Sequence, residues 1–309
     1  MSNEDKESGI LAVGDDLAAS AGRLTAWETG GVILMDDLRE AWEAAGLPPE
    51  DLVASPPTLT GALGRAAASV LRSKRHVQRP LATRGSWEIH LGRVDEKLAD
   101  EGASLEHQPI IRGWVERVDG EERPCLKVLD AELGEEARDQ ILAALPAFRH
   151  SLRSDDVRSW LRRTVGRPLF DGVQLQFRGS FYFIPERNVE AWRKVQTLLK
   201  DVSAGACRII TLPAVRAEDM VDTVLRAVKL ESEAVFAEAE ASLALGGDAE
   251  TPGISDRTIK RCEARVAAAL EKCRRYEALL GEQLPNLAER SVQLQGMIVA
   301  ARAQQVKEA

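Results

Sequence analysis

The chain has 309 residues, of which 44 % are hydrophobic and 29 % charged, and its formal net charge is −8. This supply of apolar residues is enough for packed cores, which excludes a wholly disordered chain. No apolar run reaches the roughly 18–20 residues that span a bilayer, so we expect no membrane insertion.

The N-terminal part is predicted to hold a tail and a first folded unit. Residues 1–24 are acidic and rich in Gly, Ser and Ala, which predicts a disordered tail. Within residues 25–98, apolar spacing predicts a short strand, two helices and a hairpin, at residues 32–35, 37–45, 58–73 and 77–91. Gly85 permits the tight turn of that hairpin.

The second predicted unit, residues 99–215, is of mixed α and β type. Two strands flank Asp119-Gly120, a dipeptide that is typical of a hairpin turn. The pattern then predicts a helix ended by Pro146, a second helix, a hairpin, a third helix and a short buried strand, at residues 132–148, 157–165, 173–184, 189–199 and 208–212. Residues 181–184 are apolar on both sides, which indicates a strand covered on both faces.

The remaining sequence is predicted to be helical. A long helix at 216–245 precedes a Gly-rich linker at 246–254 and a helical region at 255–309. Apolar positions of the last region recur in steps of three and four, typical of a coiled coil. We expect a homo-oligomer, or a complex with a partner protein, through the seam formed by Ile259, Val266, Cys273 and Leu280. A hairpin folded back within one chain is the open alternative, because Pro285 breaks the repeat.

Basic side chains gather in two segments of this acidic chain. Residues 58–98 carry 8 basic and 3 acidic side chains, and residues 149–194 carry 10 and 5. Such patches could contact a phosphate backbone although the total charge is negative. Alternatively, each segment pairs with a neighbouring acidic segment inside the fold.

The two basic segments also share a local pattern. Each contains an Arg-rich helix, an Arg-Pro-Leu segment and a hairpin whose turn reads Arg-Gly-Ser-aromatic, at residues 84–87 and 178–181. A basic helix before a hairpin with a basic tip is the outline of a winged helix. The predicted fold class is α+β, with winged-helix-like helix-hairpin units followed by a long helical, coiled-coil-like C-terminal region. The other interpretation is a generic α+β domain with an ordinary Arg-Gly turn.

A family resemblance rests on the second of these hairpins. The Arg-Pro-Leu segment leading into a strand, and the hairpin Phe177–Pro185 with its Tyr-Phe-Ile-Pro ending, resemble a family of uncharacterised proteins carried by bacteriophages and other mobile elements. The resemblance spans roughly residues 30–230. It implies a phage or mobile-element origin and supplies no activity and no catalytic residue.

Signatures of catalysis, metal binding and secretion are missing from the sequence. It contains no phosphate-binding glycine loop, no C-x-x-C pair and no H-E-x-x-H motif. Acid pairs such as Asp155-Asp156 are predicted to cap helices. The first residues lack the segments of a secretory signal, and the four cysteines stand apart. We therefore expect a cytoplasmic protein that is not an enzyme and holds no cofactor and no metal.

Two functions fit these patterns. The first is a non-enzymatic nucleic-acid-associated protein of a phage or mobile element, whose basic units contact the backbone of DNA or RNA. The residues assigned to this contact are Arg72, Lys74, Arg75, Arg84, Arg162, Arg163 and Arg178. The second is a protein–protein adaptor or assembly factor that works through the C-terminal helices. The repeated basic pattern favours the first function, and the acidic total with few aromatic residues favours the second.

Overall fold

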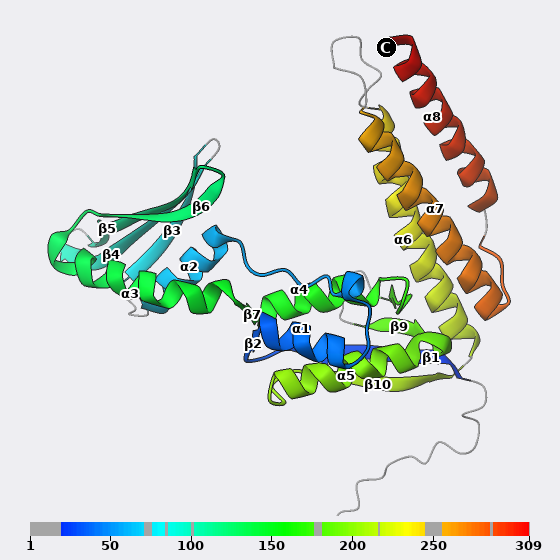
Figure 1. Cartoon of the computed structure of the whole chain (residues 1–309), viewed down its shortest axis with the longest axis horizontal. Coiled ribbons are helices and arrows are strands. Elements are labelled where there is room, and N and C mark those ends of the chain that lie inside the picture. Colours follow the sequence, from blue (N-terminus) through cyan, green and yellow to red (C-terminus); the bar gives the residue numbers. More distant parts are fainter. Residues whose placement is uncertain are drawn as a thin grey trace, which may run out of the picture. The chain divides into compact units, whose positions relative to one another are not determined.

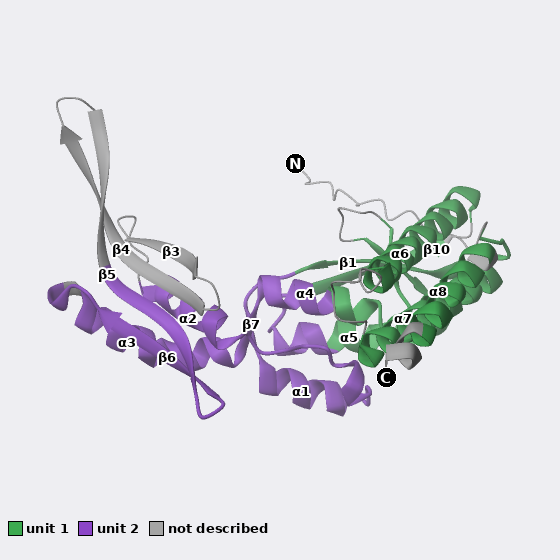
Figure 2. Cartoon of the chain, turned by 90° about the horizontal axis from the view of Figure 1, so that it is seen from above, with its two compact units in different colours: residues 1–28, 162–197, 208–309 green, residues 29–161, 198–207 purple. Residues whose placement is uncertain are grey.

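The computed structural model describes residues 20–70, 76–83, 86–99, 102–175, 181–215, 217–244, 255–284 and 287–308. The chain forms two compact units, coloured separately in Figure 2. Unit 1 is built from the described parts of residues 1–28, 162–197 and 208–309, and unit 2 from those of residues 29–161 and 198–207. Each unit has its own four-stranded antiparallel sheet.

Unit 2 is centred on a sheet whose strands follow one another as they do in the chain. Its elements are β2 (Val32–Leu34), α1 (Met35–Ala44), the 3-10 helix η2 (Pro49–Asp51), α2 (Leu59–Val70), β3 (His76–Thr83), β4 (Ser86–Ala99), β5 (Gly102–Val118), β6 (Glu121–Val128), α3 (Ala131–Arg149), β7 (Ser151–Arg153) and most of α4 (Ser154–Val165). Asp119 and Gly120, at φ of 53° and 85°, form the β5–β6 turn that the sequence predicts. The helices α2 and α3 pack on the sheet through a shared apolar core that includes Leu63, Ile111 and Ile141.

Charged groups fix the start of α4 within unit 2. The Asp156 carboxylate accepts a hydrogen bond from the backbone N–H of Arg153, at 3.0 Å. It also accepts two bonds from the Arg65 guanidinium of α2, at 2.5 and 2.7 Å. Burial alone would raise the pKa of this carboxyl group, but these hydrogen bonds lower the pKa below its ordinary value. The predicted capping role of the acid pair is thus confirmed for Asp156.

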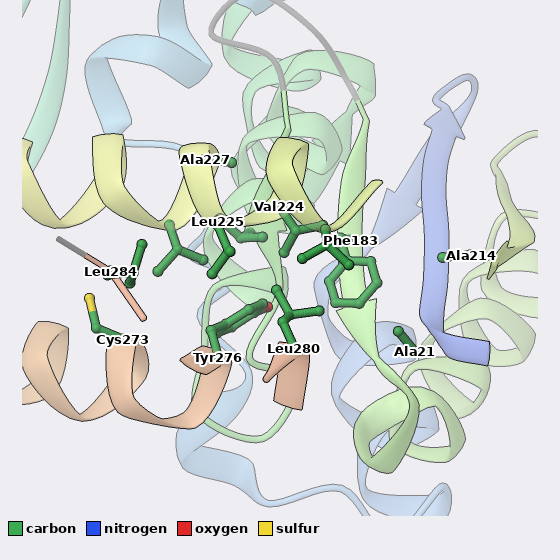
Figure 3. Packing of buried hydrophobic residues seen from close by; sticks show 13 residues of the cluster. Ala21, Phe183, Ala214, Val224, Leu225, Ala227, Cys273, Tyr276, Leu280 and Leu284 are labelled. Carbon is green, nitrogen blue, oxygen red and sulfur yellow. The ribbon is translucent and has the colours of Figure 1, made fainter. Parts of the chain in front are cut away.

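Unit 1 contains a sheet that is covered on both faces. Its elements are β1 (Ser20–Glu28), β8 (Val173–Gln174), β9 (Tyr182–Pro185), the 3-10 helix η3 (Glu186–Asn188), most of α5 (Val189–Val202), β10 (Arg208–Val215), α6 (Glu218–Ala244), α7 (Asp256–Leu280) and α8 (Leu287–Glu308). The strand order is β10-β1-β9-β8. On one face, Trp192 of α5 donates a hydrogen bond to Thr25 of β1, at 3.0 Å. On the other face, Phe183 of β9 packs with Tyr276 and other side chains of α6 and α7 (Figure 3). The predicted double coverage of β9 is confirmed.

The three C-terminal helices lie side by side within unit 1 (Figure 1). Ser255 caps the N-terminus of α7 by accepting a hydrogen bond from Thr258, and Gly281 ends the helix at φ of 78°. No helix in the described ranges is both long and apolar enough to cross a membrane.

The winged-helix prediction is wrong for both basic segments. In the first, β2 pairs with β7, and the β3–β4 hairpin continues into β5 and β6, so it is part of a sheet and does not project as a wing. In the second, the β8–β9 pair joins β1, which makes β9 an internal strand. In both cases, strands far along the chain complete the sheet, and a local helix-hairpin outline does not reveal them.

The coiled-coil prediction is also wrong, although the helical C-terminal region is present. The seam residues Ile259, Val266, Cys273 and Leu280 are at most 4 % exposed and pack within the chain, mainly on α6. Apolar positions in steps of three and four also describe the buried face of any amphipathic helix. Self-association of the chain stays a prediction, but these four side chains already have apolar partners in one copy.

Three smaller expectations also differ from the structure. Pro146 lies inside α3, which continues to Arg149, so it does not end that helix. Leu142, which the apolar pattern of residues 132–148 places inward, is 39 % exposed on α3. Phe181, which the two-sided apolar pattern of residues 181–184 places in the core, is 49 % exposed because it precedes the buried strand β9.

Candidate functional site

Few of the predicted nucleic-acid-binding residues can be placed. Those outside the described residues are Arg72, Lys74, Arg75, Arg84 and Arg178. Arg162 and Arg163 are exposed on the last turn of α4. Of these two, Arg162 lines a cavity of unit 1 and Arg163 does not. This cavity is the candidate site.

The cavity has a volume of about 420 Å³ and is lined by residues from α4, β8, β9 and α6. Two guanidinium groups line it, those of Arg162 and Arg226. Its other polar lining groups include Gln174, Tyr182 and Thr223. Its apolar lining includes Val165, Leu175 and Leu230. Leu230 is 53 % exposed, so its side chain is accessible at the cavity.

Tyr182 forms a rigid part of the cavity wall. Its ring stacks on Trp27 of β1, with centroids 4.6 Å apart and an interplanar angle of 19°. Trp27 in turn contacts Trp192 of α5. Burial raises the pKa of the Tyr182 phenol, and a hydrogen bond from Arg162, together with its charge, offsets part of that rise. The phenol is therefore protonated at neutral pH and holds the Arg162 side chain at the cavity.

A buried ammonium group bonds two of the residues that line the cavity. Lys272 of α7 is 8 % exposed, and its Nζ donates to the carbonyl oxygen of Gly172 at 2.8 Å. The same Nζ pairs with both carboxylate oxygens of Glu231, at 2.8 and 3.0 Å. Because Glu231 is the acidic residue of the lining and is paired with Lys272, it does not cancel the charge of both arginines.

A second charged cluster anchors the loop between α4 and β8. Asp171, whose side chain is 3 % exposed, accepts two hydrogen bonds from Arg275 at 2.9 and 3.0 Å. It also accepts one from Arg187 at 2.8 Å. The hydroxyl of Tyr276 donates to the backbone oxygen of Asp171, and burial raises the pKa of that phenol well above its ordinary value. These contacts tie the loop that carries Gly172 to α7 and fix the cavity's shape.

The arrangement is suited to binding an anion. Arginine is always charged and presents several N–H donors in a plane that matches phosphate and carboxylate oxygens. Arg226 makes no hydrogen bond or ion pair with the residues that the structure describes, so its donors are available. In those same residues, no group of three or more His, Cys, Asp or Glu side chains could hold a metal ion.

Sequence reasoning found one of the two cavity arginines. Arg162 belongs to the basic segment at residues 149–194, which the sequence predicts to contact nucleic acid. Arg226 lies outside that segment, on a helix that reads as an ordinary amphipathic pattern, and only the packing of α6 beside β8 brings it to the cavity. No local sequence signal marks it.

The fold is thus α+β in two units, and unit 1 contains a cavity lined by two arginines. The chain belongs to a family of unknown function, DUF6744, whose match covers residues 21–305. No curated protein and no solved structure matches it.

Proposed function

We propose that the protein is a non-enzymatic nucleic-acid-associated protein, and that the cavity of unit 1 holds one nucleotide of a bound strand. The proposal extends to a phage or other mobile element as the source and to the cytoplasm as the location. The observation that carries it is the pair of guanidinium groups, Arg162 and Arg226, on the lining of one cavity.

The lining matches the parts of a nucleotide. A phosphate group can accept hydrogen bonds from the two arginines, because charge-assisted hydrogen bonds from guanidinium to phosphate are among the strongest in proteins. A sugar hydroxyl can donate to the Thr223 oxygen, whose own hydrogen bonds the Asp219 carbonyl, and a base fits the apolar side at Leu175 and Leu230. A volume of about 420 Å³ lies in the range of small-ligand pockets, roughly 300–1,000 Å³.

The test is a salt titration of nucleic-acid binding with paired variants. Arg162→Gln combined with Arg226→Gln should weaken the binding of a labelled oligonucleotide by about 10- to 100-fold at low salt. The slope of log K against log salt should become less steep by about one to two, because fewer counterions are released. Arg226→Gln alone should give part of the effect, and it leaves the Arg162–Tyr182 contact in place.

A matched control is Arg257→Gln. Arg257 is also an exposed arginine of unit 1, near the start of α7 and 16 residues before Cys273. At a helical rise of about 1.5 Å per residue, it lies roughly 24 Å along α7 from the part that packs near the cavity. This variant should bind as the parent does. Equal loss in control and cavity variants, or no binding by the parent, would contradict the proposal.

The second candidate function, an adaptor that binds through the C-terminal helices, is favoured by one observation. Val292 and Val299 of α8 are 69 % and 66 % exposed and stand seven residues apart on one helix face. Val299 also lines a cavity of about 690 Å³ between α7 and α8. If a second copy of the chain binds here, Val299→Lys should halve the mass found by light scattering at micromolar concentration. Ala300→Lys, one residue along on the exposed surface, is the control, and a monomer mass for the parent would exclude binding of a second copy at this face.

A further inference from the structure

The sheet of unit 2 presents two different faces. On one face, Ile111 is fully buried and Val115 and Leu126 pack against the core formed with α2 and α3. Gly113 lies on this same face, where a Cβ atom would come within 2.9 Å of the Leu126 side chain and 3.7 Å of that of Leu63. The face toward the helices therefore has no room for a ligand.

Side chains alternate along a strand, so the residues between these positions lie on the opposite face. That face carries Arg112 and Trp114 of β5, with the guanidinium carbon 5.9 Å from the indole ring centroid. Both side chains are half-buried, and Lys127 of β6 is exposed. This face is accessible and combines an aromatic ring with cations, whereas the face toward α2 and α3 is apolar and covered.

The strand register aligns Arg112 and Lys127 with positions of the other two strands. Arg79 of β3 is opposite His90 of β4, which is opposite Arg112, which is opposite Lys127. One transverse row of the sheet thus contains a basic or titratable residue in each of its four strands. With strands about 4.8 Å apart, the row runs for about 14 Å. Trp114 stands in the row two residues further along β5, opposite Glu88 of β4 and Cys125 of β6.

An acidic residue on this face, Glu116, accepts a hydrogen bond from a neighbouring thiol. Glu116 follows Trp114 on the same face and lies 3.5 Å from the Cys125 sulfur. Burial, with the hydrogen bond to Glu116, raises the pKa of the Cys125 thiol, which therefore stays neutral at physiological pH. The thiol adds no negative charge next to the ring, and the exposed Lys127 supplies a positive charge on the same face.

We propose that this face of the β3–β6 sheet is a second binding site, for single-stranded nucleic acid, in which Trp114 stacks on a base while the row of Arg112 and Lys127 contacts phosphates. The inference rests on the proposed nucleic-acid function but uses none of the residues of the unit 1 cavity. Proteins that bind single strands combine a positive surface for the backbone with aromatic rings on which bases stack. Arginine beside the ring adds a cation–π contribution.

The same chemistry favours a single strand over a duplex. In a duplex each base is already stacked between its neighbours, so its face is closed to a protein ring. An unpaired base offers a free face to Trp114. The site should therefore bind single strands of either DNA or RNA more tightly than a duplex of the same sequence.

The test is equilibrium binding of labelled oligonucleotides by the full chain, with fluorescence anisotropy as the readout. The probes are a single strand of DNA, the same sequence as RNA, and the DNA duplex. Trp114→Leu should weaken single-strand binding by about tenfold or more, since base–aromatic stacking contributes that much per base. Trp114→Phe keeps a ring and should stay within about threefold of the parent. Arg112→Gln with Lys127→Gln should weaken binding and reduce its salt dependence.

The matched control is Arg117→Gln. Arg117 lies on the same strand and is exposed, but its position alternates to the other side of the sheet. Its variant should bind within about twofold of the parent, because it removes a charge and an exposed ion pair with Glu122 but no proposed contact with the nucleic acid. Circular dichroism and thermal melts confirm that each variant is folded.

The outcomes separate this site from the cavity. Loss of binding in the Trp114 and Arg112/Lys127 variants, with Trp114→Phe retained, supports the sheet site for whichever strand type binds. Unchanged binding in those variants while the Arg162/Arg226 variant loses affinity overturns the sheet site and leaves the proposed function standing. Equal or tighter binding of the duplex overturns the stacking role, and a parent that binds none of the probes overturns both proposals.

Discussion

The two sheets of the molecule have the same number of strands but differ in what covers them. In unit 1, Phe183 of β9 packs against α6 and α7, and on the other face Trp192 of α5 donates a hydrogen bond to Thr25, so both faces are covered around β9. In unit 2, α2 and α3 pack on the Ile111 face, while Trp114 on the other face is half-exposed. A fully covered sheet can offer a binding site only at its margin, as in the unit 1 cavity. A half-covered sheet offers a whole face.

The contrast between the two sheets predicts that the largest loss of stability follows removal of an aromatic ring from the covered sheet of unit 1. Phe183→Ala removes a fully buried side chain at the centre of the unit 1 core and should reduce the free energy of unfolding by about 3–5 kcal/mol. Trp114→Ala, a larger deletion on the half-exposed face, should cost less. Hydrogen exchange at increasing urea concentration measures the free energy of unfolding of each unit in both variants. A greater loss for Trp114→Ala than for Phe183→Ala would show that the face carrying Trp114 is the more deeply buried one.

A smaller effect is expected at the charged cluster that anchors unit 1. Asp171→Asn keeps the side-chain shape and suits the positive φ of 48° at this position, but removes the charge that holds Arg187 and Arg275. We expect a loss of about 2–3 kcal/mol, below the range for fully buried pairs because both arginines are partly exposed. Arg193→Gln, which breaks an exposed pair with Glu190, is the control. A loss no larger than that of the control would show that the cluster does not anchor the loop.

In unit 2, the Arg65–Asp156 pair should give a pH-dependent contribution. The folded pKa of Asp156 is below its ordinary value of 3.8, so the stabilisation is present above that value and is lost as pH falls through the folded pKa. Asp156→Asn should cost about 1–2 kcal/mol at pH 7, and this cost should shrink as pH falls from 7 through the folded pKa, where the parent carboxylate becomes protonated. Urea unfolding of parent and variant across this range is the measurement. A difference between them that does not change with pH would contradict the charge-based explanation.

The smallest expected effect lies on the accessible face itself. Lys127→Gln should change the free energy of unfolding by less than about 0.5 kcal/mol, because the side chain is exposed and makes little packing contact. Thermal unfolding of the variant tests this. A large loss would mean that this face is part of the folded core and would remove the physical basis for the sheet site.

Much of the local structure could be predicted from the sequence, because it depends on neighbouring residues. Asp119-Gly120 specified a turn through its backbone preferences, and the two-sided apolar pattern of β9 specified its coverage. Pairings between distant segments could not be predicted in this way. The β2–β7 and β1–β10 pairs involve strands whose partners lie over a hundred residues away, and their absence from the prediction is what made a winged helix look plausible.

The candidate sites show the same division. Arg162 was predicted because basic residues cluster around it, whereas Arg226 was missed because its role depends on α6 packing beside β8. The transverse row that includes Arg112 and Lys127 was missed for another reason. Its members are spread along four strands, and only the register brings them into line.

The assembly of unit 1 from separated segments has a consequence for synthesis on the ribosome. β1 pairs with β10 in a register that joins Ser20 to Val215, and Tyr276 completes the core beneath Phe183. The sheet of unit 2, by contrast, is formed from consecutive hairpins and ends at Val128. Contacts between near neighbours in the chain form faster than distant ones. The emerging polypeptide therefore has a folded sheet in unit 2 while β1 still waits for its partner strand, and the first strand made is among the last to be paired.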